Sequence, residues 1–474
     1  MNISEIYNIY KECGGRVTTD TRNLTGGELF FALKGENFDG NEYALKALET
    51  GAAYAVVNAG SRVAEDLAEG RLDEALVNAG GKCRLIPVQD TLRTLQELAR
   101  WHRSMTFVDG KPLTVIALTG TNGKTTTKEL IRAVLSVKYN VTATEGNLNN
   151  NIGVPLTLLK INAQTQIAVI EMGASHPGDI KELVDIALPN FGLVTNVGKA
   201  HLLGFGSFEG VMKTKGELYD YLRRTSDKVF VNVDNPHLCR MAAERCLQSD
   251  PERPYSLVLP YGLEYSGASV LPASPEKPFL TISLPVADGV ALEIRTNLVG
   301  AYNADNVMAA LAVGTYFGVS LEDAVRAVEA YVPSNNRSQM KRTERNTLIV
   351  DAYNANPTSM VAALGNFAAI ESDEPKILML GDMLELGEDS LSEHKTVIDR
   401  ALQIGCESIY LVGSEFGKAV ADFPDKTEEA GGPLKCFSTS ADLAAYLSEN
   451  PVSGRIVLVK GSRGTRMENV VPVL

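Results

Sequence analysis

The segment TGTNGKTTTKE, residues 119–129, contains the residue types that bind the phosphate groups of a nucleotide. It follows the apolar run LTVIALTG and precedes apolar residues at helical spacing, which predicts a strand, a loop and a helix in that order. Gly120 and Gly123 let the backbone curl close to phosphate oxygens, and the start of the helix offers unpaired N–H groups. Lys124 would place a positive charge near the β- and γ-phosphates, and the Thr125 hydroxyl would face Mg²⁺.

This loop departs from the usual spacing of phosphate-binding loops. In the pattern G-x₄-G-K-[ST] the first glycine would fall at Leu118, whereas the first glycine here is Gly120. We therefore interpret the segment as a shorter variant, in which Thr121, Asn122 and Thr126 also contact the nucleotide. A phosphate loop does not by itself distinguish a kinase, a GTPase switch, a motor and a ligase, so the function must come from other residues.

Three more residues could carry chemistry downstream of the loop. Glu171 ends the apolar run QIAVIEM, and His201 follows the run FGLVTNVGKAH. If these runs are parallel strands of one sheet, their carboxyl ends open on the same edge as the phosphate loop. A carboxylate there can hold a nucleotide-bound Mg²⁺, and a histidine there can hold a second ion. Lys215, in VMKTKGELY, has on spacing alone the features of a solvent-exposed helix lysine.

The elements that must position these residues alternate along most of the chain, which predicts an α/β fold with parallel sheets. Residues 1–90 are typical of a small α/β module. A helix over 91–104 leads into a doubly wound domain that ends near residue 332. This domain contains a β-hairpin excursion over 279–298, which is followed by a helix over 303–318. Residues 333–474 predict a second, Rossmann-like α/β domain. The apolar runs interpreted as strands of the last two domains are 113–120, 166–172, 191–197 and 228–234, then 346–353, 375–382, 408–414 and 455–462.

Composition excludes several other classes of protein. The chain has 474 residues, 22% of them charged, and a formal net charge of −13, which argues against non-specific nucleic-acid binding. It shows no basic segment followed by an apolar one and no run of about 18 apolar residues, so we expect neither a signal peptide nor a membrane span. The six scattered cysteines form no CxxC pair, which is typical of free thiols in a reducing cytoplasm.

Several long strings, in the same order, resemble the Mur ligases: GTNGKTTTKE, NLNNNIGVPLTLL, EMGASHPGDI, TNVGKAHLLGFGSFEGV, NADNVMAALAVG, VDAYNANPTSM, LGDMLELGE and VLVKGSRG. The resemblance covers nearly the whole chain and is weakest over residues 40–110 and 240–295. Within the family, the strings are most similar to the members that add D-alanyl-D-alanine, the last two residues of the peptidoglycan stem peptide, to a UDP-N-acetylmuramoyl tripeptide. The resemblance implies three domains: one for the UDP-linked substrate, a central ATPase, and a C-terminal domain that closes over the site.

The resemblance also implies roles for single residues. Lys215 matches a lysine that many members carry as a carbamate ligand of Mg²⁺, with Lys213 as the neighbouring alternative. Because carbamylation needs a neutral amine, we expect a depressed pKa for this lysine. The other matches are Asn303 and Asn306 near the adenine, Arg337 and Asp351 at the nucleotide phosphates and ribose, Asn149 and Asn150 on the substrate side, and Thr21 and Arg22 in the uridine-nucleotide segment.

Two of these matches depart from the family pattern. Asn336 stands before Arg337 where the family usually has glycine; asparagine tolerates the left-handed backbone, so we expect the turn to be kept. Thr21 stands where serine is common.

The implied reaction activates the tripeptide carboxylate with ATP as an acyl phosphate, which the amine of the dipeptide then attacks. Lys124 and two Mg²⁺ ions would offset the repulsion between the anions, one ion on Thr125 and Glu171 and the other on His201 and carbamylated Lys215. We expect a monomeric enzyme.

Two alternatives to this function remain at this point. One is another enzyme of the same type, either the ligase for the third stem residue, whose usual DNPR string is absent here, or a folylpolyglutamate-synthase-like enzyme. The other is a nucleotide-dependent switch.

Overall fold

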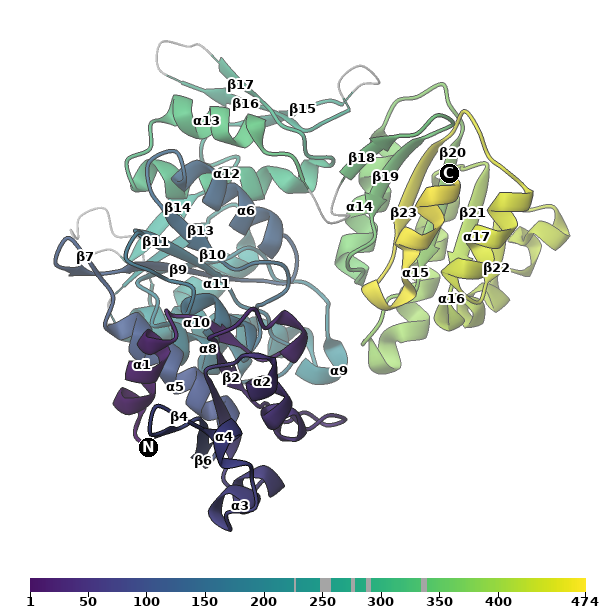
Figure 1. The fold of residues 1–474 in the computed structure, drawn as a ribbon. Helices are drawn as coiled ribbons and strands as arrows, with labels where there is room; N and C mark the ends of the chain where they lie inside the picture. The colour runs from purple at the N-terminus through teal and green to yellow at the C-terminus, as the bar shows by residue number, and fades with distance from the viewer. Residues whose placement is uncertain (226, 248–256, 274–277, 287–290, 334–338) are drawn as a thin grey trace.

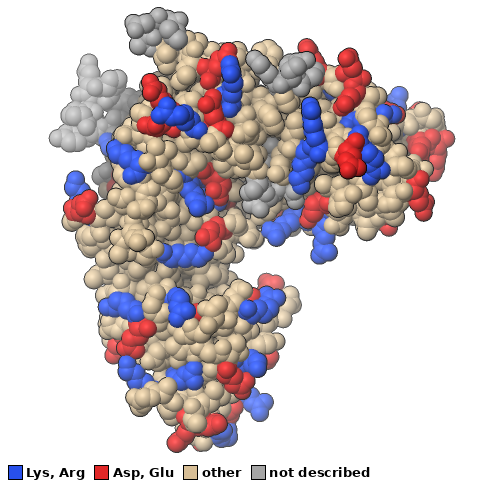
Figure 2. All heavy atoms as spheres, turned by 45° about the horizontal axis from the view of Figure 1, so that its top comes forward, with Lys and Arg blue, Asp and Glu red and all other residues tan. Residues whose placement is uncertain are grey.

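The computed structural model describes residues 1–225, 227–247, 257–273, 278–286, 291–333 and 339–474. The chain forms three α/β units, each built around its own sheet, with the N-terminal unit below the central one and the C-terminal unit to one side in Figure 1. On the face shown in Figure 2, basic and acidic side chains are interspersed. Among the described residues, no helix has both the length and the apolar character that a membrane crossing requires.

The N-terminal unit contains a four-stranded parallel sheet in the order β1-β2-β3-β6. The small α/β module predicted for residues 1–90 is confirmed, because β2, α2 and β3 follow one another along the chain. One hydrophobic core joins α1, one face of this sheet and α5 (Thr91–Ser104) of the central unit, so the two units share buried apolar contacts. The elements are α1 (Ile3–Glu12), β1 (Val17–Thr18), β2 (Leu29–Phe31), α2 (Ala44–Thr50), β3 (Tyr54–Asn58), α3 (Arg62–Ala68), α4 (Glu74–Val77), β4 (Asn78–Ala79), β5 (Lys82–Cys83) and β6 (Leu85–Val88).

The central unit contains a six-stranded parallel sheet in the order β10-β11-β9-β12-β13-β14. Its strands are β9 (Thr114–Thr119), β10 (Val141–Ala143), β11 (Ile167–Glu171), β12 (Phe191–Val194), β13 (Lys228–Asn232) and β14 (Val258–Tyr261). Its first helices are α5 (Thr91–Ser104), α6 (Lys124–Leu135), α7 (Gly153–Leu158), α8 (Asp179–Ala187), α9 (Leu202–Phe205), α10 (Phe208–Thr225) and α11 (Pro236–Glu244), and a small hairpin joins β7 (Phe107–Val108) to β8 (Lys111–Pro112).

The strand order of this sheet brings the predicted chemistry together. β9 lies between β11 and β12, and its register pairs Leu118 with Glu171 and Thr119 with Val194. The carboxyl ends of the three strands are therefore adjacent, as the doubly wound pattern predicts. Side chains alternate along β9: Val115 and Ala117 pack on the side of α5, α8 and α10, and Ile116 and Leu118 pack on the side of α6.

The predicted hairpin excursion is confirmed by β16 (Thr281–Pro285) and β17 (Ala291–Arg295), which pair antiparallel, with β15 (Ser269–Leu271) added to the other edge of β16. Residues 287–290, between the two predicted strands, lie outside the described residues. The predicted helix over 303–318 corresponds to α12 (Ala304–Tyr316), which packs with α13 (Leu321–Ala330) against α6.

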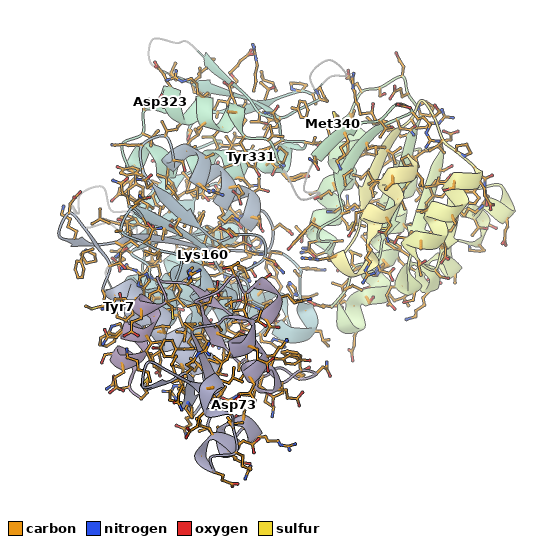
Figure 3. The ribbon with its side chains drawn as sticks, in the orientation of Figure 1. Tyr7, Asp73, Lys160, Asp323, Tyr331 and Met340 are labelled. Atoms are coloured by element: carbon orange, nitrogen blue, oxygen red, sulfur yellow. The ribbon has the colours of Figure 1, made fainter. Side chains whose placement is uncertain are left out.

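The C-terminal unit contains a six-stranded sheet in the order β18-β19-β23-β20-β21-β22, parallel except for β18. Tyr331, just after α13, and Met340, on β18, lie on either side of the join between the central and C-terminal units (Figure 3). The strands are β18 (Gln339–Arg342), β19 (Thr347–Asp351), β20 (Lys376–Gly381), β21 (Ser408–Val412), β22 (Leu434–Phe437) and β23 (Ile456–Lys460), and the α-helices are α14 (Pro357–Ala369), α15 (Ser390–Gln403), α16 (Ser414–Ala419) and α17 (Ser440–Glu449).

Candidate active site

The predicted phosphate loop joins β9 to α6, and its two glycines are required by the packing around them. Gly120 has φ +147° and Gly123 has φ +78°. A Cβ atom on Gly120 would overlap Oγ1 of Thr195, and a Cβ atom on Gly123 would lie 2.5 Å from Oδ1 of Asn306. Only glycine therefore allows the loop to pass this close to both neighbours.

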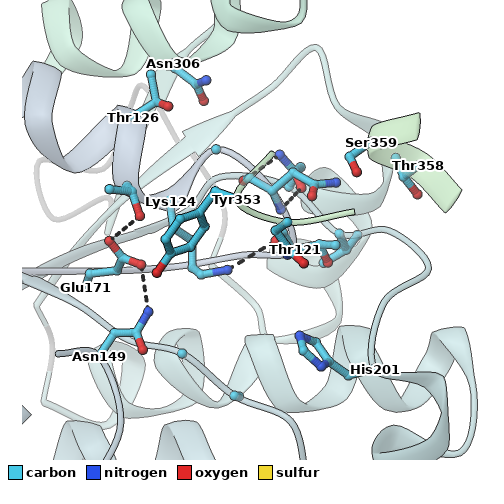
Figure 4. Close-up of a pocket in the computed structure, with 18 of the residues that line it drawn as sticks. Thr121, Lys124, Thr126, Asn149, Glu171, His201, Asn306, Tyr353, Thr358 and Ser359 are labelled. Atoms are coloured by element: carbon cyan, nitrogen blue, oxygen red, sulfur yellow. Dashed lines mark hydrogen bonds between the residues drawn. The ribbon is translucent and has the colours of Figure 1, made fainter. Parts of the chain in front are cut away.

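Lys124 and Thr125 begin α6 and point to different partners. The Lys124 ammonium donates to the carbonyl oxygens of Gly120, at 2.7 Å, and Thr121, at 3.1 Å, so it lies over its own loop. The Thr125 hydroxyl donates to Oε2 of Glu171 at 2.9 Å. The other carboxylate oxygen of Glu171 accepts from the amide of Asn149 at 2.8 Å (Figure 4).

A cavity of about 860 Å³ surrounds these groups, and residues of both the central and C-terminal units line it. Figure 4 shows Asn306 and Thr126 at one end of this pocket and His201 at the other. The predicted site residues that line the cavity are Thr121, Asn122, Gly123, Lys124, Thr125, Thr126, Asn149, Asn150, Glu171, His201, Asn303, Asn306 and Asp351. The structure thus brings most of the predicted residues into one space.

The two predicted adenine-side asparagines form a buried chain of hydrogen bonds. The hydroxyl of Thr127, on α6, donates to Oδ1 of Asn306 at 2.9 Å. The Asn306 amide donates to Oδ1 of Asn303 at 2.9 Å, and the Asn303 amide donates to the carbonyl of Val299 at 2.8 Å. Because each amide has a fixed partner, the orientation of this wall is set before any ligand binds. Asp305, which sequence reasoning missed, also lines the cavity, and burial raises the pKa of its carboxyl.

His201 has φ +50° and lies immediately before α9. Its Nδ1 atom contacts the carboxylate of Glu385, which belongs to the C-terminal unit. Burial lowers the pKa of the imidazole, whereas the Glu385 carboxylate acts in the opposite direction. A neutral imidazole is the form that can bind a metal ion.

Lys215, on α10, is buried, so the prediction from spacing alone that this lysine is solvent-exposed is wrong. Its side chain lies 3.4 Å from the carbonyl oxygen of Ala174, a residue of the cavity wall, but Lys215 itself does not line the cavity. Burial, and next the charge of Lys124, lower the pKa of the Lys215 amine well below its ordinary value. Lys213, the alternative, is exposed. The expected depressed pKa is therefore found at Lys215.

The C-terminal unit adds a buried ion pair to the cavity. Asp351 ends β19 and accepts a hydrogen bond at 2.5 Å from Lys460, which ends the neighbouring strand β23. Lys460 is 1% exposed, and sequence reasoning missed it although it ends a strand as Glu171 does. Asn356 was also missed; its amide donates to Oδ1 of Asn122 in the phosphate loop at 2.8 Å, which connects the C-terminal unit directly to the loop.

Among the described residues, the predicted substrate contacts Thr21 and Arg22 do not line the cavity, and neither does the predicted loop residue Gly120. Thr21 and Arg22 lie on a short 3₁₀ helix of the N-terminal unit (Thr21–Asn23), where Arg22 forms an exposed ion pair with Asp20 at 2.6 Å. Arg337 and its neighbour Asn336 lie outside the described residues.

The oxygen donors of the cavity fit one Mg²⁺ ion bound together with a nucleotide. The described residues contain no group of three or more His, Cys, Asp and Glu side chains that could hold a metal alone. Mg²⁺ bound to nucleotides commonly takes one or two protein oxygens and completes its shell with phosphates and waters. The buried pair of Thr125 and Glu171 supplies such oxygens beside Lys124.

The unmodified chain offers fewer ligand atoms for a second Mg²⁺ ion. The ring of Phe205 lies close to both predicted ligands, with its centroid 6.2 Å from that of His201 and 5.5 Å from the Lys215 ammonium. An ammonium has no lone pair, so Lys215 can be a ligand only after modification.

Comparison with known proteins gives consistent matches along the chain. Three family models match: the Mur ligase family catalytic domain over residues 16–103, the Mur ligase middle domain over 118–314, and the Mur ligase glutamate ligase domain over 336–463. The chain is 33% identical over 456 residues to the UDP-N-acetylmuramoyl-tripeptide–D-alanyl-D-alanine ligase of Bacillus subtilis, which covers 96% of this chain and 92% of that protein.

Solved structures give the same result. A crystal structure of MurF from Acinetobacter baumannii superimposes with a TM-score of 0.78 at 28% identity, covering 96% of this chain and 92% of that one. The MurF ligase of Thermotoga maritima, solved in complex with ADP, superimposes with a TM-score of 0.75 at 25% identity, covering 97% and 96%.

Proposed function

The chain belongs to the Mur ligase family, and on this premise we infer that it is the ATP-dependent ligase that joins D-alanyl-D-alanine to UDP-N-acetylmuramoyl tripeptide. The products are the UDP-N-acetylmuramoyl pentapeptide, ADP and phosphate, and the reaction belongs to the synthesis of peptidoglycan precursors. The observation that carries this inference is the single cavity in which a phosphate loop, the carboxylate of Glu171 and the polar ends of the C-terminal strands meet.

The first step transfers the γ-phosphoryl group of ATP to the terminal carboxylate of the tripeptide, which gives an acyl phosphate and ADP. Both reactants are anions, so the site must offset their repulsion. We assign this task to Lys124, which lies over the loop carbonyls and can turn toward a bound phosphate, and to the N–H groups at the start of α6. Asn149 and Asn150 would hold the substrate side of the cavity.

The second step forms the amide bond. The neutral amine of D-alanyl-D-alanine attacks the acyl carbon, the bond to the phosphate oxygen breaks, and inorganic phosphate leaves. Water must be excluded because it would hydrolyse the acyl phosphate. The contacts of the C-terminal unit with the phosphate loop and with the segment after β12 support a role for this unit in closing the cavity. In this assignment Arg337 and Asp351 reach the phosphates and ribose of the nucleotide.

Two Mg²⁺ ions are proposed to supply additional positive charge on the phosphates. Thr125 and Glu171 would hold one ion, and their buried hydrogen bond supports this assignment. His201 and a carbamate on Lys215 would hold the other. The lowered pKa of Lys215 supports the carbamate, because a neutral amine can add carbon dioxide and become an anionic oxygen ligand.

The remaining assignments concern the whole chain. We propose that residues 1–90 bind the UDP-linked substrate through Thr21 and Arg22, that 91–332 bind ATP, and that 333–474 close the site. We propose that the active unit is a monomer. The six cysteines are free thiols, which supports a reducing, cytoplasmic location.

The experiment that tests this function measures phosphate release from ATP with UDP-N-acetylmuramoyl tripeptide and D-alanyl-D-alanine, and identifies the product by its mass. We expect release to require both acceptor substrates and to match the amount of pentapeptide formed. ATP hydrolysis at full rate without the dipeptide, and without a new amide, would instead favour a nucleotide-dependent switch. Replacing D-alanyl-D-alanine with a diamino acid or with glutamate tests the other ligase substrates.

A further inference from the structure

Two residues in unusual backbone conformations contact each other across the boundary between the central and C-terminal units. His201 has φ +50° and Glu385 has φ +63°, although neither is glycine. Such conformations cost free energy and persist where the surrounding structure fixes them, often at functional sites. The His201 imidazole contacts the Glu385 carboxylate through Nδ1, and the backbone N–H of Leu203 donates to the carbonyl oxygen of Glu385 at 3.4 Å.

The loop that carries Glu385 is held by successive backbone hydrogen bonds. The N–H of Asp382 donates to the carbonyl of Val412 at 2.9 Å. The N–H of Met383 donates to Nε2 of His394 at 3.1 Å, and the N–H of Leu384 donates to the hydroxyl of Ser462 at 3.2 Å. Three N–H groups in a row therefore have fixed acceptors within the C-terminal unit, and the loop presents Glu385 at a defined place.

The side chains of His201 and Glu385 are too exposed for their contact to contribute much to the stability of the boundary. The His201 side chain is 37% exposed and that of Glu385 is 58% exposed. Exposed ion pairs contribute little to stability. The same boundary contains a second ion pair, Lys199 with Glu393 at 2.7 Å, in which Glu393 is only 14% exposed. Glu385 is therefore not the sole polar link found at this boundary among the described residues, and orientation of the imidazole is the effect that its contact with His201 adds.

We propose that Glu385 is a positioning residue for His201. By accepting a hydrogen bond from Nδ1 it fixes the imidazole as the tautomer in which Nε2 keeps its lone pair for the cavity. Because the two residues belong to different units, the ligand position at His201 is complete only when the C-terminal unit is docked. This inference rests on the proposed function, in which His201 holds the second Mg²⁺ ion.

The first test observes the imidazole directly, in protein without Mg²⁺ or substrates. The chain has only five histidines, so ¹⁵N-labelled histidine gives few ring signals, and a His201→Asn variant identifies the relevant pair. We expect the Nδ1–H tautomer for His201 in the unmodified chain and in Glu385→Gln, whose side-chain oxygen can still accept. Glu385→Ala should shift the ring toward the other tautomer. Unchanged His201 signals in Glu385→Ala would overturn the proposal.

The matched control is Glu393→Gln, which weakens the neighbouring ion pair without removing the partner of His201. We expect its His201 signals to stay as in the unmodified chain. The same change in Glu393→Gln as in Glu385→Ala would show that loosened docking, rather than Glu385 itself, moves the imidazole, and would also overturn the proposal.

The second test measures the Mg²⁺ concentration that gives half the maximal rate of amide formation. Loss of a hydrogen-bond partner behind a metal ligand typically weakens metal binding roughly 10–100-fold, so we expect an increase of this size in Glu385→Ala and little change in Glu393→Gln. An unchanged Mg²⁺ requirement in Glu385→Ala contradicts the proposal. If the unmodified enzyme forms no amide at any Mg²⁺ concentration, the proposed function fails, whereas the ring signals still test the position of His201.

Discussion

Replacing Lys128 with methionine tests how the phosphate helix is connected to the substrate side of the cavity. Lys128 is on α6, four residues after Lys124, and its side chain is fully buried. The ammonium donates to the carbonyl oxygen of Thr144 at 2.5 Å and pairs with Glu129 at 2.8 Å. The Thr144 hydroxyl in turn accepts from the backbone N–H of Glu171 at 3.0 Å. We therefore expect the substitution to loosen the segment that holds Glu171.

The size of the effect follows from these contacts. Removing the donor from a buried acceptor costs about 1–3 kcal/mol. Breaking a fully buried ion pair costs roughly 3–5 kcal/mol, but Glu129 is 27% exposed and can regain water, so its share is smaller. We expect a total loss of about 2–4 kcal/mol, which for a domain of this size lowers the melting temperature by roughly 4–16 °C.

The assay is thermal unfolding followed by the fluorescence of Trp101, the single tryptophan, which lies on α5 of the central unit. The control is Lys160→Met, because Lys160 forms an exposed ion pair with Glu145, the residue next to Thr144, at 2.6 Å. Such pairs contribute at most about 1 kcal/mol. If both variants melt within about 2 °C of each other, Lys128 does not hold this segment and the reasoning is refuted.

Further predictions concern the loop and the buried lysine. Lys124→Ala should reduce phosphate release to background because the loop loses its charge; unchanged turnover would remove the phosphate-loop assignment. Gly123→Ala should raise the KM for ATP, since the left-handed backbone costs about 1–2 kcal/mol and the new methyl group meets Asn306, and an unchanged KM would contradict this. Lys215→Ala should be nearly inactive and partly restored by short carboxylic acids, whereas full activity without additive would exclude the carbamate. Burial lowers the pKa of Lys215 below its ordinary 10.5, so the unfolded chain binds this proton more readily than the folded chain. The free energy of unfolding of the unmodified protein should therefore rise as pH rises from the folded-state pKa toward about 10.5. Lys215→Met should remove that slope, as measured by urea unfolding at several pH values in buffers free of carbon dioxide.

The sequence predicted those parts of the site that depend on local pattern. Glu171 follows an apolar run long enough to be a buried strand, and the doubly wound pattern then places its end beside the phosphate loop. The helix over 91–104 was predicted with the bounds that α5 has, since Asp90 caps it and its apolar residues recur at helical spacing. Strands such as β10 and β18 escaped prediction because they are short, lie at sheet edges and are only partly buried.

The features that escaped prediction arise from contacts between distant segments. Lys215 has the sequence surroundings of an exposed lysine, and it is buried because α10 packs against β12 and against the wall at Ala174. The ion pair of Asp351 with Lys460 joins residues 109 positions apart, and the contact of His201 with Glu385 joins residues 184 apart. No periodicity in the chain encodes such pairs, because they depend on how complete sheets and units are placed.

The side-chain amide of Asn356 affects how the C-terminal unit can separate from the phosphate loop between reaction cycles. Its oxygen accepts from the N–H of Ser359 at 2.9 Å and thereby caps α14, while its nitrogen donates to Asn122. If the C-terminal unit moved away from the phosphate loop, the Asn356 nitrogen would become exposed to solvent, and the cap of α14 would stay intact. Opening at this contact therefore exposes an amide that water can hydrate and does not disturb the start of α14.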